Sequence, residues 1–168
     1  AVGSEREALG LIAIADPLRP EAKDAIAELK QAGIQKVIML TGDNLRTARA
    51  VAALAGIDEV LAELKPEDKT RKVEELDERY GRVAMVGDGV NDAPALAAAH
   101  VGIAMGAAGT DVALETADVA LMADDLSRLP YLIRFSRRNW DVIFQNVSMS
   151  VVVIGSLIFG AVSGMFSL

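Results

Sequence analysis

The sequence lacks cysteine altogether and contains a single histidine and few aromatic residues. Aromatic side chains make up 4% of its 168 residues. Without cysteine, the chain has no disulfide framework, no thiol nucleophile and no cysteine-based zinc or iron–sulfur site. With one histidine as well, any metal site must be built from carboxylate, amide or thioether ligands. The apolar content, 52% of the chain, therefore consists mostly of small and aliphatic residues.

Positive charge is also in short supply. The chain has 17 lysines and arginines against 24 aspartates and glutamates, a net charge of −7. This balance argues against nucleic acid as a partner, because nucleic-acid binding usually needs a basic face. The high apolar content excludes a disordered chain of low hydrophobicity. The length suits one domain, or one small domain with an appendage.

Charge of either sign is missing from the end of the chain. The 27 residues from Val142 to Leu168 contain no charged residue, whereas about 20 apolar residues suffice to span the hydrocarbon core of a bilayer. The alternative, a buried core helix, is not favoured because soluble helices seldom lack charge over seven turns. The sequence therefore predicts a transmembrane helix over residues 142–168, with the lipid bilayer as its partner.

The flank of this apolar run indicates its orientation. Arg134, Arg137 and Arg138 precede it, and Trp140 stands at its edge. Arginines before a span and an interfacial aromatic residue are typical of the cytoplasmic side. We therefore expect residues 1–141 to be cytoplasmic, with residues 127–141 forming a helix that links them to the membrane.

Before residue 127, apolar runs typical of strands alternate with amphipathic helical patterns. This alternation predicts an α/β domain over residues 1–126, with βαβ units and a doubly wound parallel sheet. The expected strands are 8–15, 36–40, 60–62, 82–86, 101–105 and 119–122, and the expected helices are 20–32, 44–55, 66–80, 91–99 and 109–116.

Polar residues gather after two of these strands, at 36–40 and 82–86. Ligands of open α/β sheets bind beyond the carboxyl ends of the strands. A pair of carboxylates suits Mg²⁺, while a hydroxyl, backbone N–H groups and a lysine suit a phosphoryl group in transfer. The candidate residues are Thr41, Gly42 and Asp43 after the first strand, Asp88, Asn91 and Asp92 after the second, and Lys69 in the helix start between them.

Three motifs among these residues resemble the phosphorylation domain of P-type ATPases. They are T-G-D-N at 41–44, K-P-E-D-K at 65–69 and G-D-G-V-N-D-A-P-A-L at 87–96, and the strings at 16–22, 105–113 and 117–126 fit as well. T-G-D alone is usually a plain turn, but the third motif is highly specific. The chain looks most like the heavy-metal-transporting branch. The resemblance implies a Rossmann-like, haloacid-dehalogenase-type fold.

The resemblance also implies roles for the residues around the metal. Asp88 and Asp92 correspond to carboxylates that hold Mg²⁺. Asn91 corresponds to the amide that helps to organise the ion and the phosphate.

Four further residues correspond to groups that contact the phosphate and ATP. Thr41 resembles the hydroxyl donor to the phosphoryl oxygens, with the Gly42 N–H beside it. Lys69 resembles the lysine that neutralises the aspartyl phosphate. Asp43 resembles the aspartate near the nucleotide.

The family's nucleophile motif, D-K-T-G-T, is absent. Asp68-Lys69-Thr70 spells its first three letters, but Arg71 and Lys72 follow, and the string lies in a helix start. We therefore expect the nucleophile to lie outside this chain. The chain would be part of a larger multi-pass pump of the plasma membrane, with the other domains of the pump as its partners. The isolated chain is expected not to hydrolyse ATP, because covalent catalysis requires a nucleophile.

The cargo and the reaction class leave alternatives open. The apolar run lacks the Tyr-Asn pair of copper pumps and the lysine of zinc and cadmium pumps, so the resemblance favours another divalent heavy-metal cation, such as cobalt or iron, or an atypical zinc pump. A membrane-tethered phosphatase of the same superfamily would share the same site residues. A non-catalytic fragment that binds Mg²⁺ is the third possibility.

Overall fold

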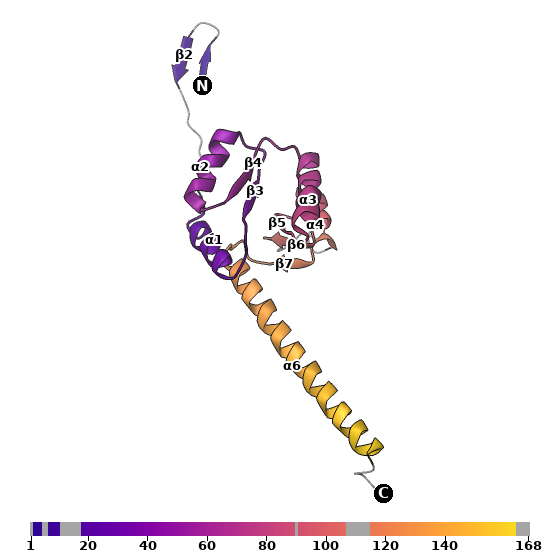
Figure 1. Ribbon diagram of the computed structural model, residues 1–168. Coiled ribbons are helices and arrows are strands. Elements are labelled where there is room, and N and C mark those ends of the chain that lie inside the picture. Colours follow the sequence, from indigo (N-terminus) through magenta and orange to yellow (C-terminus); the bar gives the residue numbers. More distant parts are fainter. Residues whose placement is uncertain (1, 5–6, 11–17, 90, 107–114, 164–168) are drawn as a thin grey trace.

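A computed structural model describes residues 2–4, 7–10, 18–89, 91–106 and 115–163 (Figure 1). At its start, β1 (Val2–Ser4) and β2 (Glu7–Gly10) pair as an antiparallel hairpin. The expectation that 8–15 joins the parallel sheet is therefore wrong for 8–10, and 11–15 lie outside the described residues. An antiparallel pair needs only a short connection, whereas a parallel pair needs a crossover.

The first α/β segment contains α1 (Ala22–Gln31), β3 (Ile38–Leu40), α2 (Leu45–Ala55) and β4 (Glu59–Leu61). Strands β3 and β4 pair in parallel, as a crossover through α2 requires. Helix α2 begins as predicted, because the Asn44 side chain accepts a hydrogen bond from the Thr47 N–H at 2.9 Å. It ends at Gly56, whose φ of 79° suits glycine.

The second segment contains α3 (Pro66–Tyr80), β5 (Ala84–Gly87), α4 (Ala93–Ala98), β6 (Val101–Met105) and β7 (Val119–Leu121). Its three strands form a parallel sheet in the order β5-β6-β7. Helix α3 has the predicted bounds, with Pro66 at its start. The helix expected at 109–116 falls mostly outside the described residues.

The parallel strands form two sheets, β3-β4 and β5-β6-β7, where the sequence predicts one. The α/β class and the parallel pairing are confirmed, but the continuity of the sheet is not. Strands β3 and β5 each have one hydrogen-bonded neighbour among the described strands, so each has a backbone edge that no described strand covers. Such an edge can accept another strand.

Buried residues pack on both faces of strand β6. Ala104 packs in one cluster with Val73 of α3 and Leu96 of α4. Its neighbours Ile103 and Met105 point to the opposite face and pack with Leu129, at the start of the last helix. Alternate residues of a strand face opposite sides, so this strand joins the helices α3 and α4 to the chain's C-terminal helix.

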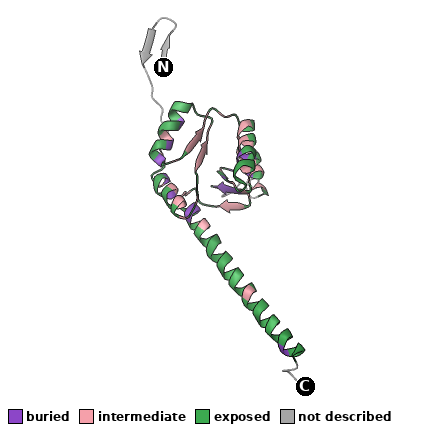
Figure 2. Ribbon diagram, in the orientation of Figure 1, coloured by how far each residue is buried: buried purple, intermediate pink, exposed green. Residues whose placement is uncertain are grey.

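That last helix, α6, runs without interruption over 35 residues, Arg128–Val162. The linking segment expected at 127–141 and the apolar segment after it therefore belong to one helix, which is about 52 Å long at 1.5 Å per residue. Figure 2 shows the start of this helix against the α/β domain and most of its remaining length exposed. Leu129 is 5% exposed, whereas Val162 is 83% exposed. The helix is long and apolar enough to cross a membrane, and none of its most apolar stretch is buried.

Candidate functional site

The loop that follows β5 is organised by Asp88. Its Oδ1 accepts a hydrogen bond from the Asn91 backbone N–H at 3.0 Å, and its Oδ2 accepts one from the Asn91 side-chain amide at 2.9 Å. Asp88 thus holds the loop in a tight turn at the carboxyl end of the strand. The carboxylate and the amide lie together there, as the spacing in the sequence predicts.

Asp92 lies at the N-terminus of α4 and pairs with Lys69 in the first turn of α3. The Lys69 Nζ donates to Asp92 Oδ1 at 2.7 Å. The two side chains are only 23% and 15% exposed, so water screens this ion pair less than one on the surface. The backbone N–H of Leu96 donates to the Asp92 carbonyl at 2.8 Å and begins α4.

Gly87 makes room for this arrangement. A Cβ atom at Gly87 would lie 2.8 Å from both Cβ and Oδ2 of Asp92, closer than such atoms can approach. The sequence pattern suggested that the glycine allows a ligand to approach the backbone. In the structure, the group that lies close to the Gly87 backbone is the Asp92 side chain of the same chain. Gly87 therefore leaves space for Asp92, a role that the sequence did not reveal.

The loop after β3 forms a second, separate group. The Thr41 Oγ1 donates to Asp43 Oδ2 at 2.9 Å, and the Asp43 N–H donates back to Thr41 Oγ1 at 3.1 Å. The Thr41 carbonyl accepts from the Leu64 N–H at 3.1 Å, and the Asp43 carbonyl accepts from the Glu63 N–H at 2.9 Å. These backbone bonds fix the loop against the connection between β4 and α3.

Gly42 lies inside this loop with little free space. A Cβ atom at Gly42 would come within 3.3 Å of the Leu64 carbonyl oxygen. A glycine is thus the residue that lets the β3 loop lie close to the chain before α3.

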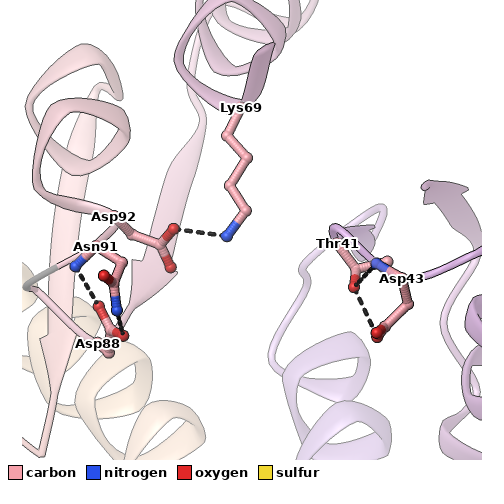
Figure 3. Close-up of polar contacts among 6 residues, drawn as sticks. All are labelled: Thr41, Asp43, Lys69, Asp88, Asn91 and Asp92. Carbon is pink, nitrogen blue, oxygen red and sulfur yellow. Dashed lines mark hydrogen bonds and ion pairs between the residues drawn. The ribbon is translucent and has the colours of Figure 1, made fainter. Parts of the chain in front are cut away.

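Figure 3 shows six of the candidate residues in two places, with Thr41 and Asp43 in the loop after β3 and the other four around the loop after β5. Contacts join four of them in two pairs, Lys69 with Asp92 and Asn91 with Asp88. The two pairs adjoin because Asn91 and Asp92 are neighbours in the sequence, and together they form one group. Thr41 and Asp43 form the other group, and no hydrogen bond or ion pair between the drawn residues joins the two. The division follows the fold, because the loops leave strands of two different sheets.

The first group offers oxygen ligands for a hard cation. Among the described residues, no three His, Cys, Asp or Glu side chains lie close enough to hold a metal ion by themselves. Asp88 and Asp92 supply two carboxylates, with the amide of Asn91 between them in sequence. This set fits Mg²⁺, which takes one or two protein carboxylates and completes its shell with phosphate oxygens and water.

Comparison with known proteins gives a family match over more than half of the chain. Residues 2–100 match the haloacid dehalogenase-like hydrolase family. The chain is 53% identical over 152 residues to the "Probable cadmium-transporting ATPase" of Alkalihalophilus pseudofirmus, covering 90% of this chain. It is 54% identical over 167 residues to the "Probable cation-transporting ATPase G" of Mycobacterium tuberculosis, covering 99% of this chain.

A solved structure gives the same result. A crystal structure of a zinc-transporting PIB-type ATPase in its E2.Pi state matches 89% of this chain, with a TM-score of 0.80 and 47% identity. The chain spans 21% of the length of each of the two curated relatives and 24% of the crystallised chain. The resemblance to heavy-metal P-type ATPases that the motifs indicate is confirmed, and the chain corresponds to about a fifth of such a protein.

Proposed function

Because the chain belongs to the haloacid dehalogenase-like hydrolase family, we propose that it is part of an ATP-driven heavy-metal cation pump that works through an aspartyl phosphate. It would supply the later part of the phosphorylation domain, within residues 1–126, and one membrane helix. The similarity to transporting ATPases over 90% and 99% of the chain supports this proposal.

The observation that carries the proposal is the group formed by Lys69, Asp88, Asn91 and Asp92. Asp88 and Asp92 would hold Mg²⁺, with Asn91 keeping Asp88 in place through two hydrogen bonds. Bound there, Mg²⁺ would neutralise phosphoryl oxygens during transfer. Lys69 adds a positive charge 2.7 Å from Asp92, where it can stabilise the charge that develops on a phosphoryl group.

The second group would act on the other side of the phosphate. The Gly42 N–H is a hydrogen-bond donor that can bind a phosphoryl oxygen, and the Thr41 hydroxyl would become a second one on turning its proton from Asp43 to the phosphate. The Asp43 Oδ2 atom accepts the hydrogen bond of the Thr41 hydroxyl at 2.9 Å. Asp43 would lie on the side of the site where the nucleotide, ATP, binds.

The nucleophilic aspartate would come from a segment that this chain does not contain. The uncovered edges of β3 and β5 support this part of the proposal. A strand paired with either edge would end at the same side of the sheet as Thr41 or Asp88, since the carboxyl ends of parallel strands lie together.

Helix α6 would carry the coupling to transport across the bilayer. It would be one of several membrane helices of a multi-pass protein of the plasma membrane, with residues 1–141 in the cytoplasm. The relatives are named for cadmium and zinc, and we propose a divalent cation of this chemical group as the cargo.

The test is phosphoenzyme formation by the complete pump from radiolabelled ATP. Purified protein is incubated with ATP and Mg²⁺ in the presence of Zn²⁺, Cd²⁺, Co²⁺ or Cu⁺, and acid-stable label on the protein is counted. We expect divalent cations to stimulate turnover, and Lys69→Met and Asp88→Asn each to reduce labelling by at least about tenfold, because each removes a group that acts in the transition state.

The matched control is Lys72→Met. Lys72 lies one turn further along α3 and pairs on the surface with Glu75 at 2.5 Å, so this variant should label normally. Normal labelling of Asp88→Asn would contradict the proposed site. Hydrolysis of small phosphate esters without any metal-stimulated ATPase activity would favour a tethered phosphatase instead.

A further inference from the structure

Two arginines, Arg137 and Arg138, lie where α6 leaves the α/β domain, and neither forms an ion pair with a described carboxylate. Among the described residues, Arg134 pairs with Glu28 of α1 at 2.8 Å. No ion pair joins Arg137 or Arg138 to any described residue, and Asp141, one turn further on, pairs with neither. Within the part of the chain that the structure describes, neither guanidinium group is engaged in an ion pair, and two arginines against one aspartate leave a net positive charge at this level of the helix.

The contact of Arg137 with the domain does not neutralise its charge. Its guanidinium lies over Gly33, where an added Cβ atom would be 3.0 Å from Nη1. Gly33 follows the C-terminus of α1 in a left-handed conformation, with φ of 89°. This contact fixes one edge of the guanidinium near the backbone, and the side chain of Arg138 is exposed.

The position of the two arginines along α6 determines what they can meet. The last charged residue is Asp141, and the apolar run begins at Val142. Arg138 is four residues before it, which is about 6 Å along the helix axis. The polar layer on each side of a bilayer is about 5–8 Å thick, so these guanidinium groups lie at the depth of lipid headgroups when α6 spans the membrane.

We propose that Arg137 and Arg138 form a binding site for anionic phospholipid headgroups on the cytoplasmic side of the membrane. This inference rests on the membrane placement of α6 proposed above. Arginine suits the role because its planar guanidinium donates two hydrogen bonds to one phosphate. Zwitterionic headgroups carry their own ammonium group, so the net positive charge at this level of the helix selects lipids with net negative charge.

Trp140 provides a built-in reporter for this site. It is the only tryptophan in the chain, it follows Arg138 by two residues, and it is 68% exposed. The full chain is reconstituted into phosphatidylcholine vesicles that contain a fixed fraction of brominated lipid. The bromine is carried by phosphatidylglycerol in one series and by phosphatidylcholine in the other, and quenching of Trp140 fluorescence is measured in both.

We expect brominated phosphatidylglycerol to quench Trp140 about twofold more than the same fraction of brominated phosphatidylcholine, because basic side chains at a membrane surface enrich anionic lipid around them. The difference should disappear in Arg137→Gln/Arg138→Gln. It should persist in Arg46→Gln/Arg49→Gln, a matched pair of exposed arginines on α2. Added salt should reduce it, since salt screens exposed charges.

The outcomes separate this site from the membrane placement. Equal quenching by the two brominated lipids would overturn the lipid site while leaving α6 in the membrane. No quenching by either lipid would overturn the spanning assignment and the lipid site with it. Retained selectivity in the Arg137/Arg138 double variant would assign the lipid preference to other residues and contradict the proposal.

Discussion

Gly87 and Asp92 lie so close that a single carbon atom added to Gly87 would fall 2.8 Å from the Asp92 carboxylate. The same carboxylate accepts the hydrogen bond from Lys69. The end of β5 and the start of α4 are therefore packed against each other with a glycine as the spacer. This contact determines where Asp92 can place its oxygens.

Replacing Gly87 with alanine should displace Asp92 and impair the site. We expect Gly87→Ala to lower phosphoenzyme formation by the complete pump by at least about tenfold, because an ångström-scale shift of a positioned group can cost that much. Gly155→Ala is the control, since nothing lies within 4 Å of an added Cβ there. Unimpaired labelling of Gly87→Ala would show that Asp92 tolerates the shift.

The pair of Lys69 and Asp92 should also stabilise the fold. We expect Lys69→Met and Asp92→Asn to be non-additive, with a coupling free energy of about 0.5–2 kcal/mol, because the charges are in direct contact and partly buried. Urea unfolding of the full chain and the three variants measures it. Strict additivity of the two single effects would contradict a stabilising ion pair.

Acid stability should depend on Asp58, which lies away from the site. The Lys30 ammonium at 2.6 Å, and then the Val37 N–H at 2.8 Å, lower the pKa of the Asp58 carboxyl below its ordinary value of 3.8. A lowered pKa in the folded state contributes stability above the unfolded-state pKa, and this contribution is lost as pH falls through the folded-state pKa.

Asp58→Asn should therefore reduce stability at neutral pH and lose less stability than the wild type when acidified through about pH 4 to 2. Thermal unfolding across this range measures the effect. Asp24→Asn serves as the control, since Asp24 forms no ion pair with a described residue. An acid limb that is the same in wild type and Asp58→Asn would rule out this linkage.

Helix α6 should transmit movement from the domain to the membrane as a rigid element. Leu129 anchors its first turn in the core, and Arg134 pairs with Glu28 of α1. We expect three glycines inserted near Arg137 to uncouple transport from ATP hydrolysis in the complete pump while phosphorylation continues, because glycine weakens a helix. Vesicle transport and phosphoenzyme assays on the same preparation measure both. Unchanged transport would contradict rigid coupling.

Coupling of transport to ATP hydrolysis should persist when only the ion pair between α6 and α1 is removed. Glu28→Gln/Arg134→Gln removes an ion pair whose side chains are 48% and 54% exposed, and such pairs contribute about 0–1 kcal/mol. Transport should remain coupled in this variant, because the buried Leu129 still holds the helix. It thus separates loss of one surface contact from loss of helix rigidity.

Much of the local structure was predictable from the sequence. The bounds of α3, the cap of α2 at Asn44 and its end at Gly56 depend on residues within one or two helical turns. The long span without charge identified α6 by length and composition alone. The grouping of Asp88, Asn91 and Asp92 was predictable for the same reason, since they share one loop.

Only the tertiary structure decided how distant segments meet. Lys69 reaches Asp92 because α3 and α4 pack on the same sheet, and Gly87 is needed because α4 turns back over β5. Hydrogen bonding between strands decided that β3 and β5 belong to different sheets, which separates Thr41 and Asp43 from the other site residues. Sequence patterns record short-range preferences, while these arrangements arise from contacts between residues far apart in the chain.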